Sequence, residues 1–117
     1  MVYSARTVKG ERLREFEEFS LLAIRALGDQ AYGVAVQQYI ERHAARPISM
    51  GAVYAALDRL ERKGFVRSAL GAATPERGGK RKRLYDLTPA GAVALREARR
   101  VRDAMWRAIA EPGRGRS

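Results

Sequence analysis

The chain has 117 residues, enough for one small domain with a single hydrophobic core. Its 23 Lys and Arg against 13 Asp and Glu give a formal net charge of +10, which suits a polyanionic partner, most often nucleic acid. A basic ribosomal protein or a membrane-surface protein would share this charge. The chain has no cysteine, which excludes disulfides, thiolate zinc sites and a cysteine nucleophile.

Targeting signals are not evident in the sequence. The first ten residues contain no apolar run, and no stretch approaches the roughly 20 apolar residues of a membrane span. We therefore expect neither a signal peptide nor a membrane partner. The absence of cysteine fits a reducing cytoplasm, where we expect the protein to be located.

Two helices are expected in the first third of the chain. Residues 11–27 are apolar nearly all round, which is typical of a helix that is central in the fold or faces a partner subunit. Gly28 ends this helix, and residues 31–43 repeat apolar side chains at helical spacing. Gly33 is unusual in a first helical turn, and we expect close packing against another backbone to be its reason. The lone His43 is expected in a core or capping role.

The rest of the chain is organised around a third helix, within residues 48–65. Ser49 is a favourable N-cap, and Gly64 follows the last charged turn. One face of this helix is apolar and predicts a buried side. The opposite face carries small or flat residues in its N-terminal half, including Gly51 and Tyr54, so it can enter a groove. An ordinary amphipathic helix with one spare tyrosine is the alternative.

A β-hairpin is predicted next. Residues 65–70 and 80–87 have strand character, and a loop rich in Gly, Thr and Pro joins them. Five basic residues lie between Arg77 and Arg83, and the pair Gly78-Gly79 lets the backbone approach a phosphate closely. This pattern favours a nucleic-acid contact over a merely solvated sheet edge, which charged strand ends often are.

A long helix is predicted from Thr88-Pro89 to about Ala110, with Thr as N-cap and Pro at the first helical position. Apolar residues repeat along it at alternating spacings of four and three, which is typical of a helix–helix seam. The residues of this seam are Ala94, Ala98, Val101, Met105 and Ala108. Because the preceding elements can already close a core, we expect the seam to meet a second subunit. Packing back onto its own domain is the alternative.

The order of three helices, a two-stranded wing and a long helix predicts a mainly α (α+β) winged helix-turn-helix. The sequence resembles the PadR family of bacterial transcriptional regulators. The resemblance rests on Ala31-Tyr32-Gly33, on residues 48–66 (ISMGAVYAALDRLERKGFV), on residues 78–85 (GGKRKRLY) and on residues 87–91 (LTPAG). Its single C-terminal helix resembles the small branch of that family.

This resemblance implies a homodimer that places two recognition helices in successive major grooves of double-stranded DNA. We expect residues 1–10 to be an N-terminal arm, 11–87 the DNA-binding domain, 88–110 the dimerisation helix and 111–117 a disordered tail. Blocking of a promoter at a palindromic operator is the function expected from the family.

The candidate DNA-binding residues lie in the third helix and the wing. They are Ser49, Met50, Gly51, Tyr54, Arg77, Gly79, Lys80 and Arg81. Ser49 and Tyr54 match family positions that contact DNA. Physically, the amides of Met50 and Gly51 form a positive helix end suited to a phosphate, whereas wing cations neutralise phosphates. Asp58 faces outward as well, and we expect it to pair with a neighbouring arginine.

Phe16 joins the residues of the seam as a candidate dimerisation residue. Trp106, Phe19 and Arg102 are candidates for binding a small aromatic effector, because relatives of the small branch often carry a tryptophan on this helix. The alternative is that Trp106 packs against the first helix of the partner.

No cofactor, metal or enzymatic activity is expected, because the sequence has no catalytic acid pair and no phosphate-binding loop motif. A structural nucleic-acid binder and a winged helix used for protein interaction are the other classes considered.

Overall fold

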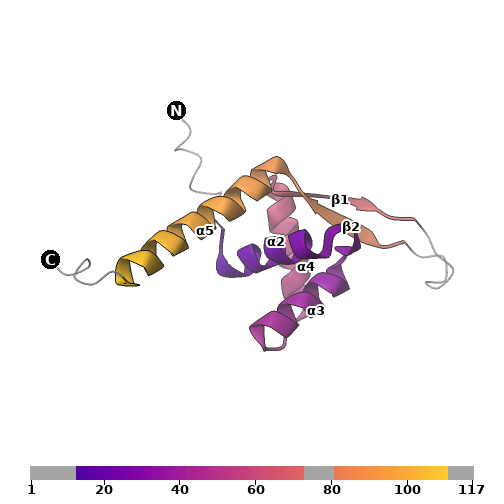
Figure 1. Cartoon of the computed structure of the whole chain (residues 1–117). Helices are drawn as coiled ribbons and strands as arrows, with labels where there is room; N and C mark the ends of the chain where they lie inside the picture. Colours follow the sequence, from indigo (N-terminus) through magenta and orange to yellow (C-terminus); the bar gives the residue numbers. More distant parts are fainter. Residues whose placement is uncertain (1–12, 73–80, 111–117) are drawn as a thin grey trace.

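The computed structural model describes residues 13–72 and 81–110 (Figure 1). The elements follow one another as α2 (Glu15–Leu27), the 3-10 turn η1 (Gly28–Gln30), α3 (Gly33–Ala44), α4 (Met50–Arg62), β1 (Val66–Leu70), β2 (Arg83–Leu87) and α5 (Pro89–Ala110). This is a winged helix-turn-helix, so the predicted fold is confirmed. None of its helices in the described ranges is long and apolar enough to cross a membrane.

The starts of the first two helices differ from the prediction. α2 begins at Glu15, and Arg14 is its extended N-cap residue, whose amide donates to Glu17 Oε1 over 3.0 Å. α3 begins at Gly33 because the two residues before it join the sheet. The amide of Tyr85 donates to the carbonyl of Ala31 over 2.8 Å, and Tyr32 forms an isolated antiparallel bridge with Leu84.

The third helix has the ends that its sequence predicts. Ser49 is its N-cap, and the Ser49 hydroxyl accepts a hydrogen bond from the amide of Ala52 over 3.0 Å. After the helix, Gly64 has φ of 82°, a left-handed conformation that a glycine adopts without steric cost. The chain therefore turns at once into β1.

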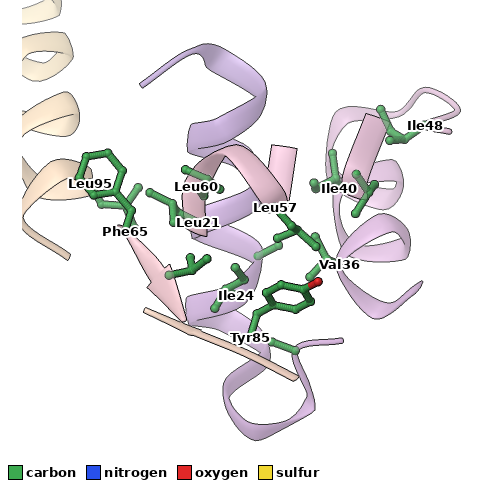
Figure 2. Close-up of a cluster of buried hydrophobic side chains, with 14 residues drawn as sticks. Leu21, Ile24, Val36, Ile40, Ile48, Leu57, Leu60, Phe65, Tyr85 and Leu95 are labelled. Carbon is green, nitrogen blue, oxygen red and sulfur yellow. The ribbon is translucent and has the colours of Figure 1, made fainter. Parts of the chain in front are cut away.

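The core lies between α2, α3 and α4, and the sheet and α5 close it from one side (Figure 2). The buried apolar residues are Leu21, Ala23, Ile24, Ala31, Val36, Ile40, Ile48, Val53, Leu57, Leu60, Phe65, Val66, Tyr85 and Leu95. The predicted apolar face of α4 is thus buried, and Met50 is half-buried beside it. Burial of α4 on one side leaves its other face free for contacts.

The two strands form an antiparallel ladder from Val66↔Leu87 to Leu70↔Arg83. Tyr85 is the buried residue of β2, and Arg83 and Asp86 are exposed. In Figure 1 the hairpin leaves the body on the side opposite to α5. The paired strands therefore anchor the base of the wing to the body.

α5 starts where its sequence predicts. The Thr88 hydroxyl accepts from the amide of Gly91 over 3.0 Å and donates to the carbonyl of Gly64 over 2.6 Å. Gly91 and Leu95 are the buried residues of this helix, whereas residues 99–110 are exposed throughout. The second half of α5 projects from the body (Figure 1).

Candidate nucleic-acid interface

The outer face of α4 carries the residues singled out in the sequence. Ser49, Gly51 and Tyr54 are exposed, and 49% of the Tyr54 surface is accessible. Helix geometry leaves the first amides without intrahelical acceptors, and Ser49 satisfies the amide of Ala52. The amides of Met50 and Gly51 remain at the positive end of α4, where an anion is favoured.

Tyr54 lies against the start of α3. A Cβ built on Gly33 would be 2.6 Å from the Tyr54 hydroxyl oxygen and 2.8 Å from two ring carbons. Gly33 therefore makes room for a tyrosine ring and not for another backbone, which corrects the sequence-based expectation. The Tyr54 ring therefore packs against α3 on one side, and about half of its surface stays exposed.

The acidic residue of this face is neutralised within the helix. Arg62 donates to Asp58 Oδ2 over 2.6 Å, four residues apart, and both side chains are largely exposed. The prediction that Asp58 pairs with a neighbouring arginine is confirmed. The pair lowers the repulsion that an unpaired carboxylate would exert on a phosphate backbone.

The wing is described only at its base. Arg77, Gly79 and Lys80, three of its candidate DNA-binding residues, lie outside the described residues, whereas Arg81 is described and exposed. Lys82 turns back toward α3, because its Nζ lies 3.6 Å from the centroid of the Tyr32 ring. This cation–π contact ties the wing to the helix-turn-helix. The contact between Lys82 and Tyr32 could not be predicted from the sequence, because it depends on the pairing of Tyr32 with β2.

A buried charge cluster joins α2 to the C-terminal end of α4, on the side away from its exposed face. Glu17 is fully buried, its Oε2 accepts from Arg59 Nε and its Oε1 accepts from Lys63 Nζ, both over 2.8 Å. Burial alone would raise the pKa of Glu17, but the hydrogen bonds from Lys63, the Arg14 amide and Arg59 together hold that pKa below its ordinary value. The sequence analysis missed this cluster. The position of Glu17 beside the apolar face of residues 11–27 could have indicated a buried carboxylate that needs partners.

The second half of α5 presents a continuous apolar surface, which we call the α5 strip. It consists of Val101, Met105, Trp106 and Ile109, with exposures of 43%, 65%, 71% and 75%. Ala108 beside it is exposed, whereas Ala94, Ala98 and Phe16 are half-buried in the single chain. The predicted seam therefore continues beyond its expected residues to Ile109.

The three effector candidates lie on α2 and α5. Phe19 lines a groove of about 530 Å³ between α2 and α3, together with Leu22, Tyr39 and His43. Arg102 donates to Glu18 over 2.6 Å, and Trp106 lies on the exposed α5 strip. His43 is exposed and stacks on Tyr39, and its Nδ1 lies 2.9 Å from the carbonyl oxygen of Tyr39 in the last turn of α3, so of the two expected roles it has the capping one and not the core one. Arg102 and Trp106 are four residues apart on one face of α5, and Glu18, the partner of Arg102, is next to Phe19 in the chain.

This arrangement defines a class of protein. A helix-turn-helix with an exposed, low-profile second helix and a basic wing beside it is a DNA-binding module. The comparisons with known proteins name the family. The PadR-like transcriptional regulator family matches residues 21–97, about two thirds of the chain, and the protein belongs to this family.

Three relatives agree with this assignment. The transcriptional regulator Rv3488 of Mycobacterium tuberculosis (strain ATCC 25618 / H37Rv) is 31% identical over 100 residues, which cover 83% of this chain and 89% of the relative. A PadR-like transcriptional regulator from Bacillus cereus has a similar fold, with a TM-score of 0.66, 20% identity and coverage of 90% and 93%. A PadR family regulator from Eggerthella lenta has a TM-score of 0.57 at 26% identity, with coverage of 79% and 73%.

The protein is thus a DNA-binding transcriptional regulator of the PadR family and not an enzyme. This excludes the structural nucleic-acid binder and the protein-interaction module as its principal function.

Proposed function

We propose that the protein is a homodimeric repressor that binds a palindromic operator in double-stranded DNA. In this proposal the two copies of α4 enter successive major grooves, and residues 88–110 join the subunits. The α5 strip is the observation that carries the proposal. It is a large apolar surface on a helix that projects from a domain with a complete core.

A second copy of the chain is the partner that fits this strip. Monomeric proteins rarely expose a continuous apolar surface of this kind, and each such side chain gains about 1.5–3 kcal/mol when it is fully buried. The partner's surface includes Phe16 and the groove of α2 and α3, where Leu22 is 44% exposed. In this arrangement Trp106 packs against α2 of the partner.

The dimer is tested by Met105→Glu. Met105 is largely exposed in the single chain, so the variant folds but places a charge in the proposed interface. We expect a dimer for the wild-type protein and a monomer for the variant in analytical ultracentrifugation. Arg96→Glu is the matched control, because Arg96 is exposed on the same helix outside the strip. A dimeric Met105→Glu variant would contradict the proposed interface.

DNA binding at the proposed residues is tested by operator selection. Genomic fragments are captured with the protein, and the bound site is footprinted. We expect two protected half-sites of inverted sequence, with centres separated by about 10 bp or a multiple of it. Added protein should then reduce transcription from the same fragment in vitro. A single protected half-site would contradict the palindrome, and increased transcription would contradict repression.

Single contacts are tested on the selected operator. Tyr54 is half-exposed on the outer face of α4, so Tyr54→Ala should weaken binding to that operator. Lys80→Ala should weaken all sequences alike and reduce the salt slope by about one unit if it contacts a phosphate. An unchanged slope would remove Lys80 from the interface.

An aromatic effector is a second candidate role, favoured by the groove that Phe19 and Tyr39 line within the proposed interface. Trp106 is the only tryptophan, so its fluorescence reports this region. A flat aromatic dye that quenches Trp106 and releases the operator would support the role. Quenching without any change in operator affinity would contradict it.

A further inference from the structure

Two neighbouring glutamates of α2 hold two different helices. Glu17 contacts the C-terminal part of α4 through Arg59 and Lys63, both over 2.8 Å. Glu18, with a side chain only 11% exposed, contacts α5 through Arg102 over 2.6 Å. Successive residues of a helix point about 100° apart, so α2 can support both helices at once.

The end of α4 and the start of α5 are also joined directly. The Thr88 hydroxyl donates to the Gly64 carbonyl over 2.6 Å, and the Thr88 amide donates to the Phe65 carbonyl over 3.1 Å. Gly91 lies so close to Phe65 that an added Cβ would be 2.1 Å from its carbonyl oxygen. The three helices α2, α4 and α5 are therefore connected pairwise, which fixes their relative directions.

Arg102 acts far from the joint at Thr88. It lies 13 residues after Pro89, a distance of about 20 Å along the helix at 1.5 Å per residue. The neighbouring arginines bind within α5, Arg99 to Asp103 and Arg100 to Glu97. The Glu18–Arg102 ion pair is thus a polar contact that holds the projecting half of α5 to the body.

We propose that Glu18 and Arg102 are positioning residues that set the distance between the two half-sites recognised by the dimer. This inference rests on the proposed function, because it requires a dimer formed through α5. In the proposed dimer, a rotation of α5 about the joint at Thr88 changes the distance between the α4 helices of the two subunits. Since one base pair is about 3.4 Å of duplex, a small rotation over this length changes the preferred spacing.

The experiment measures binding to duplexes that differ only in spacing. Two copies of the footprinted half-site are placed in inverted orientation, and the spacer is changed by one base pair at a time. We expect the wild-type protein to prefer one spacing over its neighbours by about tenfold or more. For Arg102→Met and Glu18→Gln we expect that preference to fall to about threefold or less.

Two further variants separate positioning from charge and from stability. Arg102→Lys keeps the ion pair and should keep the narrow preference. Arg99→Gln removes one positive charge from the same helix, but its partner is within α5, so the wild-type preference should remain. Because Arg102 is 55% exposed, Arg102→Met should unfold within a few degrees of the wild-type protein.

The outcomes are distinguishable. A narrow, wild-type preference in both Arg102→Met and Glu18→Gln overturns the positioning role and leaves the proposed function intact. A broadened preference in Arg99→Gln also overturns it, because charge alone would then account for the effect. If the wild-type protein binds single half-sites as a monomer, both the proposed function and this inference fail.

Discussion

The joint between the end of α4 and the start of α5 leads to a prediction for Gly91→Ala. The added Cβ would lie 2.1 Å from the Phe65 carbonyl oxygen, 3.0 Å from its carbon and 3.3 Å from Leu87 Cδ2. Carbon and carbonyl oxygen normally approach to about 3.3–3.6 Å. The start of α5 must therefore move away from Phe65 by about 1.2 Å or more.

The magnitude follows from what this movement disturbs. Displacement weakens the two hydrogen bonds of Thr88 to residues 64 and 65, at about 0.5–1.5 kcal/mol each. Overpacking near Leu95 adds about 1–3 kcal/mol, and the better helix propensity of alanine returns up to about 1 kcal/mol. These terms sum to a net loss of about 1–6 kcal/mol in the free energy of unfolding.

Urea unfolding followed by circular dichroism measures this loss. Gly51→Ala is the matched control, since the nearest atom to its added Cβ, Ser49 Oγ, is 4.0 Å away. Because Gly51 is an exposed glycine in a helix, Gly51→Ala should raise the free energy of unfolding by up to about 1 kcal/mol. If Gly91→Ala unfolds within about 0.5 kcal/mol of the wild-type protein, the close approach of α5 to Phe65 is wrong.

Two more predictions concern α2 and α4. Because the pKa of Glu17 is lower in the folded protein than its ordinary value of 4.5, its carboxylate stabilises the fold above that pH, and this contribution is lost as the pH falls through the lowered value. Glu17→Gln should cost about 1–3 kcal/mol at pH 7 in urea unfolding, and the difference from the wild-type protein should shrink below about pH 4.5; a constant difference down to pH 3 would contradict the ion cluster. Gly33→Ala should destabilise the wild-type protein by about 1–2 kcal/mol but stabilise the Tyr54→Ala variant, because the ring that obstructs the new Cβ is then absent. If Gly33→Ala changed the free energy of unfolding in the same direction in both proteins, the Tyr54 ring would not be the reason for a glycine at position 33.

The contact between Gly33 and Tyr54 matters for DNA binding as well as for stability. It places one side of the Tyr54 ring on α3 and leaves the other side half-exposed. A side chain held in this way loses little conformational freedom when it binds. We therefore expect Tyr54 to contribute more to affinity than a mobile exposed tyrosine would.

The helices and the ends of several of them could be predicted from the sequence by itself. Apolar spacing, the Ser49 cap and the Thr88-Pro89 start are local signals, because hydrogen bonds and dihedral preferences act between residues close in the chain. The pairing of Asp58 with a neighbouring arginine was predictable for the same reason, since residues four apart share a helix face.

Only the tertiary structure decided which distant residues meet. The partners of Glu17 are 42 and 46 residues away, and Arg102 is 84 residues from Glu18. Gly33 and Lys82 likewise depend on contacts between separate elements, with Tyr54 and Tyr32. Such contacts follow from how the helices and the sheet pack around one core, and no local preference of the chain encodes that packing.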